Sequence, residues 1–208
     1  MHKKKFFFIV FEGVEGTGKT YQISKLYNNL KRNNYNVVKT REPGGSSTAE
    51  KIRKLIFSKK STKFDKLTDY YLMIAARNEH VKNTLFPAKK EKKIVISDRF
   101  SDSTYAYQVV GKKIDKKVNL INQKYILKNL KPNLTIILKA NFDTTSSRVK
   151  KRKNNNKFDK LKNNFYKKAQ NAFLSLAKKN KNYLVLDSSK NTPELEKKIF
   201  NIVLDNIR

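Results

Sequence analysis

Cysteine is absent from the sequence, and histidine occurs only twice, at His2 and His80. A chain without cysteine forms no disulfide bond, no thiolate metal site and no cysteine nucleophile. Two histidines are too few for a histidine-rich metal site. These absences fit a reducing compartment, so we expect a cytoplasmic protein.

Acidic side chains are also scarce. The chain has 17 Asp and Glu residues and 48 Lys and Arg residues, which gives a formal net charge of +31. A surface this basic suggests polyanionic partners. The excess is mostly lysine, however, and runs with asparagine and isoleucine along the whole chain instead of forming one basic arm. We interpret much of it as compositional bias and expect nucleic-acid binding to be non-specific at most.

Long hydrophobic runs are missing. The run at 6–11 is far shorter than a membrane span and leads into Glu12 and a glycine-rich loop without a cleavage site, so we expect neither a signal peptide nor a membrane partner. The hydrophobic fraction of 38%, with 13 Phe and 10 Tyr, is nevertheless too high for a disordered polycation. We expect a single domain covering residues 1–208.

Short apolar stretches recur along the chain and are largely unbroken, as in strands that are covered on both faces. They lie at 6–11, 37–38, 94–96, 134–138 and 183–186. Stretches with helical spacing of apolar residues separate them, for example 23–30 and 118–126. This alternation predicts an α/β fold of three layers, a five-stranded parallel sheet flanked by helices.

One segment, 150–164, is of low complexity and consists mainly of lysine and asparagine. It has too few apolar residues to bury much surface. Two interpretations remain open: a solvated loop between two helices, or a small mobile basic lid at about 150–162 that closes over a polyanionic ligand.

A glycine-rich motif between the first strand and the first helix matches the phosphate-loop pattern G-x-x-x-x-G-K-[ST]. In such a loop, backbone N–H groups and the helix N-terminus bind phosphate oxygens, and the glycines permit close approach. We expect Lys19 to reach the β- and γ-phosphates and the Thr20 hydroxyl to bind Mg²⁺, with a structural glycine turn as the alternative. The predicted phosphate-binding residues are Gly13, Val14, Glu15, Gly16, Thr17, Gly18, Lys19 and Thr20.

The apolar run at 94–96 ends in Ser97, Asp98 and Arg99. An acidic residue at the carboxyl end of a parallel strand lies near the metal ion of a phosphate loop, so Asp98 is a second candidate Mg²⁺ ligand. Arg99 is suited to bind a phosphate bidentately, although a plain salt bridge with an acidic neighbour is the alternative.

Four separated segments, followed by 131–135, give the chain a resemblance to thymidylate kinase, a P-loop nucleoside monophosphate kinase family. The segments are 11–20, 40–45 (Thr-Arg-Glu-Pro-Gly-Gly), 75–77 (Ala-Ala-Arg) and 98–108 (Asp-Arg-Phe-Ser-Asp-Ser-Thr-Tyr-Ala-Tyr-Gln). The resemblance implies a P-loop NTPase-type fold, Mg²⁺-dependent phosphoryl transfer from ATP to dTMP giving dTDP and ADP, and a homodimer.

The same resemblance implies residues for the dTMP site. Arg77 and Gln108 correspond to residues that bind the thymine ring, and Glu15 to one beside the 3′-hydroxyl. The full implied set is Glu15, Arg41, Glu42, Arg53, Met73, Arg77, Arg99, Ser103, Thr104, Tyr107 and Gln108. Ordinary roles remain open for three of these, because Arg53 suits a solvent-facing helix position and Ser103 and Tyr107 suit cap and core positions.

Position 16 is glycine, so the chain resembles the family form in which lid arginines supply the catalytic cation. Arg148 and Arg152, four residues apart, stand where that form has them, and with Lys19 and Arg99 they are the predicted catalytic residues. For both arginines, a role as a surface helix residue is the alternative. Lys160 stands where the family has a lid arginine, so lid closure is expected to be weaker.

Met73 stands where the family usually has an aromatic residue, so base discrimination is expected to be looser. A related kinase acting on another nucleotide or a nucleoside therefore stays open. The alternative from a different class is a P-loop nucleic-acid-binding protein, for which the chain shows no known recognition motif.

Overall fold

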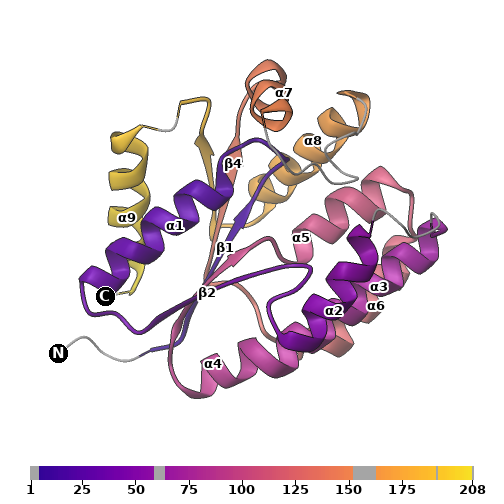
Figure 1. Ribbon diagram of the computed structural model, residues 1–208, viewed down its shortest axis with the longest axis horizontal. Coiled ribbons are helices and arrows are strands. Elements are labelled where there is room, and N and C mark those ends of the chain that lie inside the picture. Colours follow the sequence, from indigo (N-terminus) through magenta and orange to yellow (C-terminus); the bar gives the residue numbers. More distant parts are fainter. Residues whose placement is uncertain (1–4, 59–63, 152–162, 191, 208) are drawn as a thin grey trace.

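The computed structural model describes residues 5–58, 64–151, 163–190 and 192–207. Its centre is a five-stranded sheet in the order β2-β3-β1-β4-β5, in which every neighbouring pair is parallel (Figure 1). The strands are β1 (Phe7–Glu12), β2 (Val37–Arg41), β3 (Ile94–Asp98), β4 (Leu134–Lys139) and β5 (Tyr183–Asp187). The predicted parallel α/β sheet is therefore confirmed.

Alternate residues of β1 enter different cores, which explains why its sequence is unbroken rather than alternating. Ile9 and Phe11 belong to a core shared with α1 (Lys19–Arg32) and α9 (Pro193–Ile207). Phe8 and Val10 belong to a core on the opposite face of the sheet. A strand covered on both sides keeps apolar side chains on both faces.

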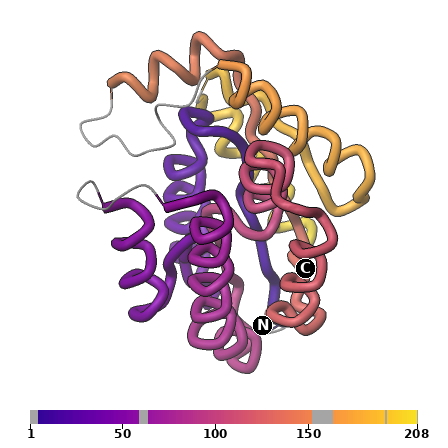
Figure 2. Tube along the Cα trace, turned by 90° about the vertical axis from the view of Figure 1, so that its right-hand side faces the viewer, coloured from indigo at the N-terminus to yellow at the C-terminus, as the bar shows by residue number. Residues whose placement is uncertain are grey.

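Helices cover both faces of the sheet, with α1 and α9 on one side in Figure 1 and the larger group on the other. Figure 2 shows α2 beside α3 in that group. The larger group includes α2 (Ser47–Phe57), α3 (Lys66–His80), α4 (Phe86–Lys90), α5 (Ser101–Thr104), α6 (Lys116–Leu127) and α8 (Asn163–Lys179). Two π-helical turns, Val81–Leu85 and Tyr105–Gly111, follow α3 and α5. The predicted three-layer arrangement is thus present.

The carboxyl ends of the strands lie together at one edge of the sheet, because Phe11 pairs with Asp98 and Asp98 with Arg41 across three strands. The glycine-rich loop follows β1 at this edge, and α7 (Phe142–Lys150) stands at the same end after β4 (Figure 1). Parallel sheets bind ligands at this edge. Among the described ranges, no helix combines the length and apolar character needed to cross a membrane.

Candidate active site

The loop between β1 and α1 has the backbone conformation that its glycines allow. Gly13 and Gly16 have φ values of +132° and +80°, in the region that L-residues rarely adopt. A Cβ atom would stand 2.3 Å from the Leu138 carbonyl oxygen at Gly13 and 2.4 Å from the Thr145 carbonyl oxygen at Gly16. The loop is therefore packed against β4 and α7 through positions that admit no side chain.

Lys19 is the first residue of α1, and it is buried. Its Nζ atom donates hydrogen bonds to the carbonyl oxygens of Gly13 and Val14, each at 2.9 Å, so the side chain folds back over the loop. Burial, and next the charge of Arg99, lower the pKa of Lys19 from 10.5 to about 8. An anion close to Nζ favours the charged ammonium.

Thr20 and Asp98 meet at the end of β3, where the Thr20 hydroxyl donates to Asp98 Oδ2 at 3.0 Å. The described residues contain no cluster of three or more His, Cys, Asp or Glu side chains that would enclose a metal ion by itself. Mg²⁺ in nucleotide sites is held by one or two carboxylates together with substrate phosphates and water. One carboxylate beside one hydroxyl therefore fits Mg²⁺.

Arg99 lies between the loop and the π-helical turn after α5. Its Nη2 atom donates to Glu15 Oε1 at 2.7 Å and its Nη1 atom to Ser103 Oγ at 2.9 Å. Tyr107 donates its hydroxyl to Glu15 Oε2 at 2.7 Å, and the guanidinium lies over the Tyr107 ring at 5.1 Å. Ser103 and Tyr107 thus belong to the polar cluster around Arg99 rather than serving only as cap and core residues.

Arg77 is buried, and its hydrogen bonds use Nε and Nη2. Nε donates to Glu42 Oε2 at 2.8 Å, while Nη2 donates to the Phe100 carbonyl oxygen at 3.0 Å and to Thr104 Oγ1 at 2.9 Å. Nη1 is also buried and has no hydrogen-bond partner. Burial opposes ionisation of Glu42, but the charge of Arg77 and the hydrogen bond from His80 lower the pKa of Glu42 below its usual value.

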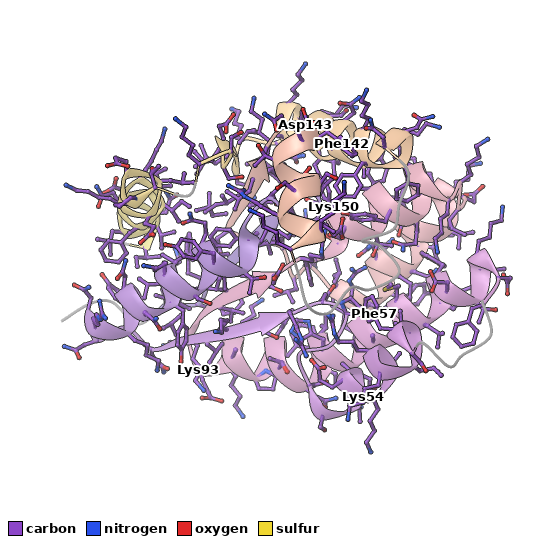
Figure 3. The ribbon with its side chains drawn as sticks, turned by 45° about the horizontal axis from the view of Figure 1, so that its top comes forward. Lys54, Phe57, Lys93, Phe142, Asp143 and Lys150 are labelled. Atoms are coloured by element: carbon purple, nitrogen blue, oxygen red, sulfur yellow. The ribbon has the colours of Figure 1, made fainter. Side chains whose placement is uncertain are left out.

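A cavity of about 190 Å³ joins these groups. The predicted residues that line it are Glu15, Lys19, Thr20, Arg41, Glu42, Arg53, Met73, Arg77, Asp98, Arg99, Ser103, Thr104, Tyr107 and Gln108. Sequence reasoning missed the apolar lining residues Phe57 and Phe100. In Figure 3, Phe57 points toward the interior and Lys54 away from it.

Two cations at the cavity mouth have different surroundings. Arg41 is exposed and donates to both carboxylate oxygens of Glu50, at 3.0 and 2.8 Å. Arg53 is half-buried, donates from Nη1 to the Pro43 carbonyl oxygen at 2.6 Å and lies over the Phe57 ring at 4.7 Å. Arg53 therefore belongs to the cavity wall and does not point into solvent.

Arg148 binds backbone carbonyl oxygens. Its Nη1 atom donates to Ser188 at 2.9 Å and Gly16 at 3.2 Å, and its Nη2 atom donates to Ser189 at 2.7 Å. Arg148 therefore links α7 to the phosphate loop, whereas a surface helix residue would point into solvent. Arg152 and Lys160 lie outside the described residues, as does 152–162 of the predicted lid.

Sequence reasoning also missed two buried titratable groups. His80 is fully buried and contacts Glu42, and its position three residues after Arg77 on the same helix was the available signal. Glu12 accepts hydrogen bonds from the Phe100 N–H (2.9 Å) and from the Ser103 N–H and hydroxyl (3.1 and 2.6 Å). Burial, and next the charge of Asp102, raise the pKa of Glu12 to about 8.

Comparison with known proteins gives a consistent result. A family model described as thymidylate kinase matches residues 11–199. A thymidylate kinase of Mycoplasma capricolum subsp. capricolum is 39% identical over 204 residues, which cover 97% of this chain and 96% of the relative. One from Mycoplasma genitalium is 42% identical, covering 91% and 90%. The crystal structure of thymidylate kinase from Ehrlichia chaffeensis superposes with a TM-score of 0.76 at 31% identity, covering 98% and 100%.

Proposed function

Because the chain belongs to the thymidylate kinase family, we propose that the cavity is the active site in which it transfers a phosphoryl group from ATP to dTMP, giving dTDP and ADP. The observation that carries the site assignment is that one cavity is lined both by Lys19 of the phosphate loop and by Arg77, whose Nη1 has no hydrogen-bond partner. Such a cavity suits two nucleotides that meet at their phosphates.

At the ATP end, the loop 13–20 supplies backbone N–H groups, and Lys19 supplies a positive charge. Lys19 now bonds two loop carbonyl oxygens, and phosphate oxygens are stronger acceptors because they are charged. We expect Nζ to exchange these carbonyls for the β- and γ-phosphates. Thr20 and Asp98 would hold Mg²⁺, which neutralises phosphate charge when it is bound.

At the dTMP end, Arg99 and Arg53 are assigned to the acceptor phosphate, with Arg41 at the mouth. Phosphoryl transfer depends mainly on alignment and on neutralising charge, and two arginines that line one cavity supply both. Glu15, held by Arg99 and Tyr107, is assigned to the deoxyribose 3′-hydroxyl.

The base is assigned to the apolar and polar groups around Arg77. A guanidinium nitrogen is a donor only, so Nη1 suits a ring carbonyl oxygen. Gln108 offers an amide donor and an acceptor to a neighbouring edge, and Met73, Phe57 and Phe100 supply apolar surface. An amino group in place of the carbonyl oxygen would leave Nη1 without an acceptor, which disfavours cytosine.

The catalytic cation is assigned to Arg152, while Arg148 is assigned to holding the phosphate loop. Arg148 already donates to three carbonyl oxygens at its place between α7, the loop and the end of β5.

A homodimer is part of the proposal, and an exposed apolar face on α3 and α6 supports it. Scattered exposed apolar residues are ordinary, but several on adjacent helices form a surface that association buries. The residues are Leu67 and Tyr71 on α3 and Leu120, Ile121 and Tyr125 on α6.

An acceptor panel tests the proposed function. We expect dTMP to give the highest kcat/KM with ATP and Mg²⁺, dUMP to follow because it keeps the same ring carbonyls, and dCMP and dAMP to be poor. Thymidine lacks the phosphate that Arg99 and Arg53 bind and should not react at a comparable rate. A higher kcat/KM for dCMP or thymidine than for dTMP would contradict the assignment.

A further inference from the structure

His80 ends α3 and is completely buried between two segments of the chain. Its Nδ1 atom lies 2.9 Å from Glu42 Oε1, and its Nε2 atom lies 2.7 Å from Thr40 Oγ1. Thr40 is in β2, and Glu42 follows that strand. Both ring nitrogens therefore bind the segment that leads from β2 into the cavity.

The proton positions follow from the partners. Glu42 is ionised, because its pKa lies below the usual value, and a carboxylate oxygen only accepts hydrogen bonds. Nδ1 must therefore carry the proton that binds Oε1. In the neutral ring Nε2 is then an acceptor, and the Thr40 hydroxyl donates to it. Glu42 thus selects the Nδ1–H tautomer, and the Thr40 hydroxyl, which can donate or accept, adapts to Nε2.

Glu42 connects His80 to Arg77. Oε1 accepts from His80, and Oε2 accepts from Arg77 through Nε at 2.8 Å and Nη2 at 2.7 Å. Nε and Nη2 are engaged, and Nη1 is the guanidinium nitrogen that has no hydrogen-bond partner. Glu42, together with the Phe100 carbonyl oxygen and the Thr104 hydroxyl, holds the guanidinium and so sets the direction in which Nη1 points. His80 holds the Glu42 carboxylate from its other oxygen.

The loop after β2 closes tightly over this arrangement. A Cβ atom on Gly45 would stand 2.4 Å from Thr40 Oγ1 and 2.7 Å from His80 Nε2, at a φ of +89°. Thr84 donates its hydroxyl to the Gly45 carbonyl oxygen at 2.7 Å, which holds the loop there. The bond between Thr40 and His80 is therefore enclosed by the protein and screened from water.

We propose that His80 is a positioning residue for base recognition, which holds Glu42 so that Arg77 presents Nη1 to a ring carbonyl oxygen of the acceptor nucleotide. This inference rests on the proposed assignment of Arg77 to the base. His80 itself does not line the cavity. Its replacement should therefore change recognition of the acceptor base and leave ATP binding and phosphoryl transfer nearly unchanged.

Two amide substitutions separate the two contacts of the ring. In His80→Asn the amide nitrogen occupies the place of Nδ1 and still donates to Glu42, whereas in His80→Gln it occupies the place of Nε2 and reaches only toward Thr40. We expect His80→Gln to raise the KM for dTMP about tenfold and His80→Asn to raise it no more than about threefold. The KM for ATP and kcat should stay within about twofold to threefold of the parent in both.

A purely structural role predicts a different order, because glutamine fills the volume of histidine better than asparagine does. Equal KM values for dTMP in the two variants, or a larger rise in His80→Asn, would overturn the proposal. Leu85→Ala removes an equally buried side chain one turn beyond α3 and is the control for lost packing, with an unchanged KM for dTMP expected.

Arg77→Ala distinguishes the failure of this inference from the failure of the proposed function. If Arg77→Ala raises the KM for dTMP and neither His80 variant does, His80 is not a positioning residue although the base site is correct. If Arg77→Ala leaves the KM for dTMP unchanged, the assignment of Arg77 to the base is itself wrong, and the inference about His80 falls with it.

Discussion

Arg148 donates a hydrogen bond from Nη1 to the carbonyl oxygen of Gly16 at 3.2 Å, which ties α7 to the phosphate loop. The same side chain binds Ser188 and Ser189, so the loop, α7 and the segment after β5 form one unit. At Gly16 a Cβ atom would meet the backbone of Thr145 on α7, which shows how closely the two segments pack. The position of the phosphate loop thus depends on contacts with α7, a helix that lies far from it in the sequence.

Replacing Arg148 by alanine should therefore weaken ATP binding more than dTMP binding. We expect Arg148→Ala to raise the KM for ATP about tenfold, because three partly buried hydrogen bonds to carbonyl oxygens are lost at once. Arg148→Lys should recover only part of it, since one ammonium cannot span carbonyls in different directions. Lys151→Ala, at an exposed site in the residue after α7, is the control. Equal increases in KM for both substrates would contradict this role.

Lys19 should be needed for the rate of phosphoryl transfer but not for the fold. Lys19→Ala is expected to lower kcat by roughly 10² to 10³, because the charge that neutralises the transferring phosphate is lost. Lys25→Ala changes a partly exposed lysine on the same helix and should leave kcat unchanged. Circular dichroism of both variants checks the fold, and near-normal kcat in a folded Lys19→Ala enzyme would remove Lys19 from the mechanism.

The part of the site that local sequence patterns predict without the family resemblance lies in short contiguous segments. Gly13 to Thr20 follow an apolar strand and precede a helix, and each feature is visible within fifteen residues. Asp98 and Arg99 closely follow the apolar run of β3, so the same local pattern predicts them. The parallel sheet is also predictable, because strands buried on both faces have apolar residues at successive positions and not alternating polar and apolar ones.

Contacts between distant segments leave little trace in the sequence. His80 and Glu42 are 38 residues apart, and only the packing of α3 against the end of β2 brings them together. Arg148 binds backbone carbonyl oxygens, which every residue possesses, so no side-chain pattern marks its partners. A single sequence therefore identifies the groups that meet the phosphates more readily than those that hold them in place.

Glu12 should make stability depend on pH. Its pKa rises from 4.5 unfolded to about 8 folded, so the folded state binds more protons between these values, and stability falls as pH rises from about 4.5 to 8. Glu12→Gln resembles the protonated carboxyl and should lose this dependence. We expect urea unfolding to show the wild type losing on the order of a few kcal/mol relative to Glu12→Gln between pH 5 and 8. A constant difference would mean that Glu12 is ionised throughout.

The apolar face on α3 and α6 should control assembly. Light scattering is expected to give about twice the chain mass of 24.3 kDa for the wild type. Ile121→Lys places a charge on this face and should give a monomer at the same concentration. Tyr21→Lys, at an exposed position on α1, is the matched control and should stay dimeric. A dimer in both variants would place the interface elsewhere.

Arg152 should contribute more to the rate than to substrate binding. Gly16 leaves Lys19 as the cation of the phosphate loop, and Arg148 is engaged with backbone carbonyl oxygens, so we expect Arg152 to supply the further positive charge at the transferring phosphoryl group. We expect Arg152→Ala to lower kcat about 10²-fold or more, with the KM for dTMP nearly unchanged. Arg152→Lys should recover only part of the rate, because an ammonium does not bind two phosphate oxygens in one plane. A kcat within about threefold of the parent in Arg152→Ala would assign the catalytic cation to a different side chain.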